Sequence, residues 1–216
     1  MEYNKDKIVI FDWGGIVESH KEGEYNSNKA KENLIKKLNP AANNIIKKWK
    51  QCDSDDTGRM ISTYNKTEDI EKWYERIKAK FNLKYDLEEF ARLYKEEFDN
   101  IYFYKDIVEL EHMTKQRCKI AILSNLTVLD KSRIDNHLDL KQYDYVWLSC
   151  DMEVRKPNKK IYEIVESECK IAKCNILFID DTEENIETAK LMGWNTCYAY
   201  GYEYDKIKNA IKNFLK

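Results

Sequence analysis

Apolar residues near the N-terminus form one short, unbroken run. Residues 8–11 read Ile-Val-Ile-Phe, Asp12 follows directly, and Gly14 and Gly15 come just after it. A β-branched and aromatic run this short, ended by breaker residues, predicts a buried strand rather than a core helix. Asp12 is then expected at the carboxyl end of the strand, with glycines that let the backbone bend sharply. On its own, the stretch favours an ordinary Asp-containing turn.

Beyond Val17 the hydrophobic pattern becomes helical and stays so for about eighty residues. Apolar residues recur three and four positions apart around Leu34 and Ile45, and again within 70–81 and 87–98. These stripes predict a small all-helical bundle. The breaker-rich segment 51–58 carries three carboxylates. A connecting turn is favoured there over a calcium loop, which needs a longer series of ligands.

From Lys105 onward, strand patterns alternate with helical ones. Short apolar runs predict four more strands, at 119–124, 145–149, 175–180 and 195–199. Lys156 and Pro157 are predicted to open one of the intervening helices, with the proline in its first turn. This alternation predicts right-handed crossovers and a parallel sheet covered on both faces. The fold class is therefore α/β, with a long helical segment inserted after the first strand.

Composition and charge exclude several classes of partner. Lys and Arg total 37 and Asp and Glu 39, so the formal charge is −2. This balance leaves no electrostatic footprint for nucleic acid or for an anionic membrane surface. No run approaches the length of a transmembrane helix and the N-terminus is charged, so a cytoplasmic protein is expected. The six cysteines show no C-x-x-C pairing and are expected to be reduced thiols.

Polar side chains follow three of the predicted strands, where parallel sheets bind ligands. Asp12 follows the first, Ser124-Asn125 ends the second, and Asp180-Asp181 ends the fourth. Ser124-Asn125 near a helix N-terminus suits an oxyanion, although taken alone the pair favours an ordinary turn with a helix cap. Adjacent carboxylates after an apolar strand are costly unless a cation or hydrogen bonds compensate them. Helix capping would explain only one of the two.

Lys156 lies in the segment Arg155-Lys156-Pro157, directly before a predicted helix. Its ammonium could neutralise a phosphate and a nearby carboxylate together, while the simpler interpretation is a solvated lysine. Asn185 lies on the first turn of the helix after Asp180-Asp181. The order of these groups along the chain is more specific than any one of them.

That order resembles the haloacid dehalogenase-like hydrolase superfamily over most of the chain. The motifs that carry the resemblance are Phe11-Asp12-Trp13-Gly14-Gly15, Leu123-Ser124-Asn125, Arg155-Lys156-Pro157 and residues 178–185. The resemblance implies a Rossmann-like, doubly wound parallel sheet core, residues 1–17 and 100–216. It also implies an inserted all-helical cap domain, residues 18–99, as in the subgroup whose cap follows the first motif.

The resemblance further implies a magnesium-dependent phosphatase acting on a small phosphorylated metabolite, with a sugar phosphate as one candidate. Asp12 would be the nucleophile, a known use of a carboxylate, and would form an aspartyl-phosphate. Mg²⁺ would bind Asp12, the backbone carbonyl of Gly14 and Asp181, with Asp180 as a further direct or water-mediated ligand.

The same resemblance assigns the groups that hold the phosphate. Ser124, Asn125 and Lys156 would bind the transferring phosphoryl oxygens, and Lys156 would also take part in catalysis. Gly15 and Asn185 would support the site. The cap would close over it, exclude water and select the substrate.

One departure from the family pattern bears on mechanism. The first motif usually carries a second aspartate as general acid and base, and here that position is Gly14. Loss of a positioned general acid costs roughly 10²–10⁴ in rate. The substrate could have a good leaving group, or Glu18, His20 or water could substitute. Otherwise the protein would bind a phospholigand without turnover. A metal-independent haloacid dehalogenase is a further alternative, disfavoured by Asp180-Asp181 and by the absence of Tyr at position 14.

Overall fold

The computed structural model describes residues 3–137 and 139–216, and its centre is a parallel sheet of five strands in the order β3-β2-β1-β4-β5. All four neighbouring pairs run parallel. The strands are β1 (Asn4–Phe11), β2 (Cys118–Ser124), β3 (Tyr145–Leu148), β4 (Ile176–Asp180) and β5 (Asn195–Tyr198). This arrangement confirms the predicted α/β, Rossmann-like class. It also puts β1, which precedes Asp12, in the middle of the sheet.

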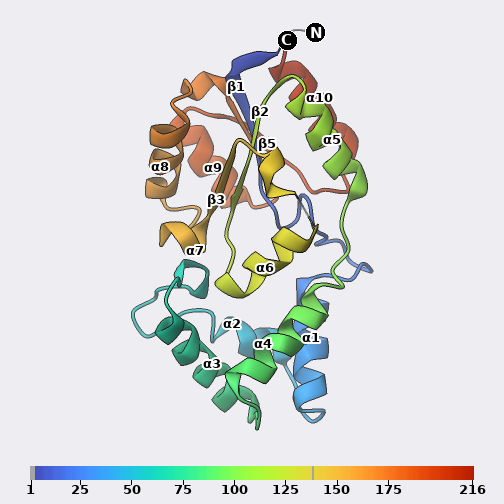
Figure 1. The fold of residues 1–216 in the computed structure, drawn as a ribbon, viewed down its shortest axis with the longest axis vertical. Helices are drawn as coiled ribbons and strands as arrows, with labels where there is room; N and C mark the ends of the chain where they lie inside the picture. Colours follow the sequence, from blue (N-terminus) through green and yellow to red (C-terminus); the bar gives the residue numbers. More distant parts are fainter. Residues whose placement is uncertain (1–2, 138) are drawn as a thin grey trace.

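Helices cover both faces of the sheet (Figure 1). Those on one face are α5 (Lys105–Lys115) and α10 (Tyr204–Phe214), and those on the other are α8 (Lys159–Cys169) and α9 (Glu183–Met192). Alternate side chains of β1 explain this doubly wound form. Val9 and Phe11 belong to one hydrophobic cluster, and Ile8 and Ile10 belong to the other. Because strand side chains alternate between faces, a central strand with both faces covered is apolar at every position.

One predicted helix start was wrong. Pro157 was expected in the first turn of the helix that follows Lys156, but α8 begins at Lys159. The side chain of Asn158 accepts a hydrogen bond from the backbone N–H of Lys160 and caps the helix. Since an Asn cap satisfies a free donor of the first turn, the helix begins after it. Lys156 and Pro157 therefore lie in a loop beside the sheet.

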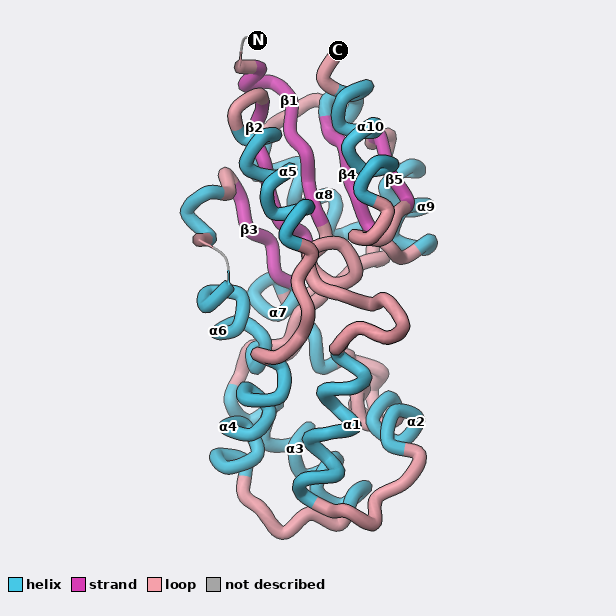
Figure 2. The backbone as a smooth tube through the Cα atoms, turned by 90° about the vertical axis from the view of Figure 1, so that its right-hand side faces the viewer, coloured by secondary structure: helices cyan, strands magenta, loops and turns pink. Residues whose placement is uncertain are grey.

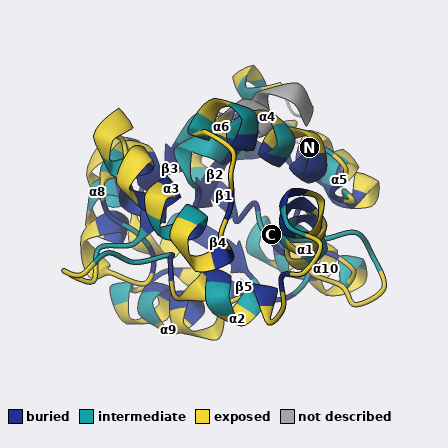
Figure 3. Cartoon of the chain, turned by 90° about the horizontal axis from the view of Figure 1, so that it is seen from below, coloured by how far each residue is buried: buried dark blue, intermediate teal, exposed yellow. Residues whose placement is uncertain are grey.

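The segment between β1 and α5 is helical, as its periodicity predicted. It contains α1 (Ser27–Leu38), α2 (Ile45–Lys50), the 3-10 turn η1 (Ile61–Thr63), α3 (Thr67–Phe81) and α4 (Leu87–Phe98). These helices form a hydrophobic cluster of their own, with the rings of Trp49, Trp73 and Phe90 at its centre. Figure 2 shows them beyond one end of the sheet, and Figure 3 views the molecule from that end, coloured by burial. We call residues 18–99 the cap segment.

The two segments of the chain that connect the cap segment to the sheet lie side by side. Ser19 donates its backbone N–H to Tyr102, Tyr102 donates to Tyr25, and Tyr104 donates to Val17. The cap segment is thereby held opposite the carboxyl ends of the strands. Within the described ranges, no helix is both long and apolar enough to span a bilayer. All six cysteines are free thiols, as predicted.

Candidate active site

Asp12 lies directly after β1 and is only 7% exposed. One carboxylate oxygen, Oδ1, accepts hydrogen bonds from the backbone N–H of Trp13 (2.6 Å) and the hydroxyl of Ser124 (2.8 Å). The other, Oδ2, lies 2.9 Å from the ammonium of Lys156. The carboxylate is therefore held by groups from the turn after β1, from β2 and from the loop before α8.

Lys156 is completely buried, and its ammonium has three acceptors. Besides Asp12, it contacts the backbone carbonyl of Leu123 (2.8 Å) and Oδ2 of Asp180 (2.7 Å). Burial lowers the pKa of Lys156, but the charges of Asp12 and Asp180 outweigh that effect and raise it above its ordinary value. Because an ammonium has three donors, this geometry uses all of them. Lys156 is a fixed, charged group beside the nucleophile candidate and not a solvated lysine.

Asp180 ends β4 and is also completely buried. Its two oxygens accept from Lys156, from the backbone N–H of Thr182 and from the side-chain amide of Asn185. Burial raises the pKa of Asp180 to about 6, with the Asp12 charge acting in the same direction and Lys156 opposing both. The structure thus brings Asn185 to Asp180, where it orients the carboxylate against Lys156.

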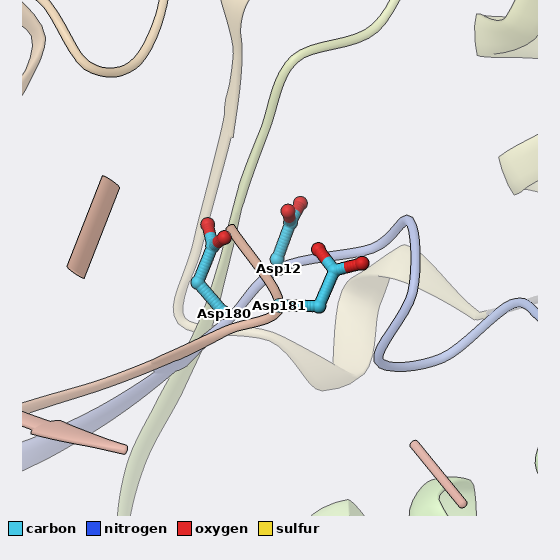
Figure 4. Close-up of side chains that lie close together, drawn as sticks. All are labelled: Asp12, Asp180 and Asp181. Carbon is cyan, nitrogen blue, oxygen red and sulfur yellow. The ribbon is translucent and has the colours of Figure 1, made fainter. Parts of the chain in front are cut away.

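Asp12, Asp180 and Asp181 form a group of three carboxylates at the ends of β1 and β4. One oxygen from each lies within 4.8 Å of the others, and Figure 4 shows the three carboxyl groups on the same side of the chain. Carboxylate oxygens are ligands that Mg²⁺ prefers. One ammonium cannot balance three carboxylates, so a divalent cation fits the charge of this site as well as its donor atoms.

Ser124 and Asn125 both line the site, but their side chains are used differently. The Ser124 hydroxyl donates to Asp12. The Asn125 amide is engaged with the backbone of Lys156: its Oδ1 accepts from the Lys156 N–H (2.9 Å), and its Nδ2 donates to the Lys156 carbonyl (3.0 Å). Asn125 therefore fixes the loop that carries Lys156.

Gly15 is a position where only glycine fits. Its φ is +80°, which L side chains rarely adopt, and a Cβ there would lie 2.0 Å from Oδ2 of Asp181. The missing side chain therefore lets the carboxylate of Asp181 approach the loop after β1.

The space beside Gly14 holds two titratable side chains. A Cβ on Gly14 would lie 3.7 Å from Oε1 of Glu18 and 3.8 Å from Nε2 of His20. Glu18 also accepts from the Trp13 indole (2.9 Å), and Nδ1 of His20 lies 3.0 Å from Asp181. The hydrogen bond with Asp181 raises the pKa of His20, against the effect of burial. Glu18 and His20, the two side chains that the sequence suggested as substitutes for an acid at position 14, therefore do lie next to Gly14.

A cavity of about 340 Å³ lies between the carboxyl ends of the strands and the cap segment. Asp12, Ser124 and Asp181 line its core side. Sequence reasoning gave no site role to several other lining residues, among them Lys31, Asp53, Ser62, Trp73 and Arg155. Nothing in the helical periodicity marks them, because the face that a cap helix turns toward the core depends on tertiary packing.

A protein-family model described as haloacid dehalogenase-like hydrolase matches residues 15–199. Among curated proteins, mouse acyl-CoA dehydrogenase family member 10 is 24% identical over 223 residues, covering 95% of this chain and 18% of that protein. An (S)-2-haloacid dehalogenase from Pseudomonas sp. (strain YL) is 26% identical over 90 residues, covering 41% and 39% respectively. The chain thus spans less than half the length of either relative.

Solved structures show the same fold. The HAD-family enzyme BT-2542 from Bacteroides thetaiotaomicron, in a magnesium complex, matches with a TM-score of 0.72 and 16% identity, over 92% of this chain and 95% of that one. The L-2-haloacid dehalogenase from Xanthobacter autotrophicus, with chloropropionic acid covalently bound, matches with a TM-score of 0.63 and 18% identity, over 88% and 76%. Since the family model covers most of the chain, this protein belongs to the haloacid dehalogenase-like hydrolases.

Proposed function

We propose that this hydrolase is a magnesium-dependent phosphatase that acts on a small phosphorylated metabolite, with a sugar phosphate as one candidate. The observation that carries the proposal is the group formed by Asp12, Asp180 and Asp181 beside the buried ammonium of Lys156. Three clustered carboxylates suit a cation and a phosphoryl group, whereas they would repel an anionic substrate that binds without metal. BT-2542 has also been solved in complex with magnesium and inorganic phosphate.

In the proposed reaction, the carboxylate of Asp12 attacks phosphorus and the alcohol leaves, which produces an aspartyl-phosphate that water then hydrolyses. The backbone N–H of Trp13 and the Ser124 hydroxyl hold the attacking carboxylate in one orientation. Lys156 lies close enough to Asp12 to offset negative charge on the transferring phosphoryl oxygens. Asn125 keeps the Lys156 loop in place.

The residues that would hold Mg²⁺ are Asp12, Asp181 and the carbonyl of Gly14, with Asp180 as a further direct or water-mediated ligand. When bound, the ion would offset the charge that builds up on the phosphoryl group. Gly15 and Asn185 support this set. Gly15 leaves room for Asp181, and Asn185 orients Asp180.

Two explanations account for how the leaving group departs without an aspartate at position 14. Glu18 and His20 flank Gly14, beside the place where an aspartate side chain would project. A phosphate with a good leaving group, such as an acyl phosphate, needs little protonation. Both routes are compatible with Gly14, and comparison of the two activated compounds in the assay below with an alkyl phosphate separates them.

The second candidate function is metal-independent dehalogenation of a short haloacid. The similarity to two haloacid dehalogenases favours it, because such enzymes also resemble this chain in fold. The third is binding of a phospholigand without turnover, which Gly14 favours. Both candidates leave the clustering of Asp180 and Asp181 with Asp12 unexplained, since neither requires a cation at that point.

The test measures hydrolysis of p-nitrophenyl phosphate and acetyl phosphate by the wild-type protein, with Mg²⁺ and with EDTA. Magnesium-dependent release of phosphate from either compound is expected. Turnover of both compounds without turnover of an alkyl phosphate such as ethyl phosphate would favour the good-leaving-group route, because p-nitrophenolate and acetate both leave without a general acid. Release of chloride from chloropropionate in EDTA, with no phosphate release in Mg²⁺, would replace the proposal by dehalogenation. No turnover of any compound would leave ligand binding as the function.

A further inference from the structure

The cavity above Asp12 continues into the cap segment, away from the reacting groups. There it is lined by Lys31 of α1, Ser62 of η1, Trp73 of α3, and Arg155 from the loop between α7 (Ser149–Met152) and α8. Its volume of about 340 Å³ is near the lower end of the range for small-molecule pockets, ~300–1,000 Å³. The proposed reaction uses none of these four side chains, so their presence in the cavity wall needs another explanation.

Three of the four carry a buried polar atom that has no hydrogen-bond partner among the described residues. These atoms are Nε1 of Trp73, Oγ of Ser62 and Nε of Arg155. Trp73 is 1% exposed and Ser62 is 8% exposed. Buried polar groups in folded proteins are nearly always paired. Because the indole and guanidinium groups only donate, Trp73 and Arg155 add donors and no acceptors to the wall at this end of the cavity.

The cations at this end are also without ion-pair partners. Neither Lys31 nor Arg155 forms a side-chain hydrogen bond or salt bridge within residues 3–137 and 139–216. Lys31 instead lies over the ring of Trp49, 5.6 Å from its centroid. Both cations act electrostatically on Asp53, which also lines the cavity. With Lys50, three cations act on this one carboxylate. The other acidic residue nearby, Asp130, is occupied by the hydroxyls of Tyr94 and Thr127.

We propose that Lys31 and Arg155, with Trp73 and Ser62 in the wall beside them, form a subsite for a carboxylate at the end of the substrate opposite its phosphate. The substrates would then be small phosphorylated carboxylic acids, and this inference rests on the proposed phosphatase function. A guanidinium matches the two oxygens of a carboxylate, and the ammonium of Lys31 supplies a second positive charge at the same end of the cavity. A neutral sugar end would desolvate both cations without compensating their charge.

The test compares substrates that share a phosphate and differ at the far end. Phosphoglycolate is paired with ethyl phosphate, and phosphoglycerate with glycerol phosphate, each with Mg²⁺ present. In the wild-type protein, kcat/KM is expected to be at least about tenfold higher for the carboxylate member of a pair, the ratio that a charge-assisted hydrogen bond supplies. Arg155→Gln and Lys31→Gln should each remove most of that preference. Lys36→Gln, on the exposed side of α1, should keep it.

Hydrolysis of p-nitrophenyl phosphate in the same assays reports on the proposed function separately. If the wild-type protein hydrolyses it but turns over both members of each pair equally, or neither, the carboxylate subsite is overturned while the phosphatase stands. The same conclusion follows if Arg155→Gln retains the preference. If no phosphate compound is hydrolysed, acetyl phosphate included, the proposed function fails and the subsite falls with it. Arg155→Lys is an additional probe, since it keeps the charge and loses the planar fork.

Discussion

The carboxyl group of Glu111 gives this fold a stability that falls as pH rises. Glu111 lies on α5 and is completely buried. Its Oε2 accepts a hydrogen bond from the hydroxyl of Tyr143 (2.8 Å), and its Oε1 has no partner among the described residues. Burial raises the pKa of Glu111 from 4.5 to about 8, and the bond from Tyr143 opposes the shift only in part.

The sign of the effect follows from the two pKa values. Between pH 4.5 and about 8 the folded protein keeps the proton of Glu111, whereas the unfolded chain releases it. Unfolding therefore becomes easier as pH rises through this window. One pKa unit corresponds to about 1.4 kcal/mol, so this group lowers the free energy of unfolding by about 3–4 kcal/mol between pH 5 and pH 8.

The Glu111→Gln variant tests this reasoning, because glutamine can still accept from Tyr143 and has no charge to bury. Urea denaturation at pH 5, 6, 7 and 8 should show the variant close to wild type at pH 5 and more stable by about 3–4 kcal/mol at pH 8. Glu109→Gln, an exposed change on the same helix, is the matched control and should follow the wild-type curve. Parallel curves for Glu111→Gln and wild type across these pH values would refute the argument.

Three further predictions concern the site. Gly15→Ala should abolish magnesium-dependent activity, since its Cβ would displace the Asp181 carboxylate. Gly58 has nearly the same φ (+81°) and no atom within 4 Å of the position that a Cβ would take, so Gly58→Ala should keep activity. Equal activity of the two variants would contradict the steric argument. Asp181→Ala should weaken Mg²⁺ binding markedly in calorimetric titration, and an unchanged affinity would refute its assignment as a ligand. Lys156→Met should lower the free energy of unfolding in EDTA by about 3–5 kcal/mol, because it leaves buried carboxylates unpaired. The exposed change Lys160→Met should cost less than about 0.5 kcal/mol, and a similar loss for both lysines would show that burial of Lys156 contributes little.

The sheet could be predicted because the hydrophobic pattern that marks each strand lies within that strand. A central strand of a doubly wound sheet must be apolar on both faces, so β1 and β4 stand out as short unbroken apolar runs, and the polar residue that ends each run marks the edge where ligands bind. The helical cap segment was visible for a similar reason, in its 3.6-residue periodicity. The start of α8 was mispredicted because the cap by Asn158 competes with the usual first-turn place of proline.

The contacts within the site could be predicted only in part. Sequence order indicated that Asp12, Lys156 and Asp180 belong together, but not that Lys156 is fully buried between the two carboxylates. Nor did it show that the amide of Asn125 is engaged with the backbone of Lys156. Such contacts depend on how a loop folds back onto the sheet. Arg155, next to Lys156 in the chain, faces the cap segment across the cavity, a placement that no local pattern encodes.

The central claim is that Asp12 is the nucleophile of a magnesium-dependent phosphatase, and its most direct test is the Asp12→Asn variant. The variant keeps the shape of the side chain, and circular dichroism spectra that match the wild type would show that it is folded. With Mg²⁺ and acetyl phosphate or p-nitrophenyl phosphate, kcat/KM should fall by at least about 1,000-fold, because an amide cannot form the covalent intermediate. A folded Asp12→Asn protein that hydrolyses these compounds as fast as wild type would contradict the account.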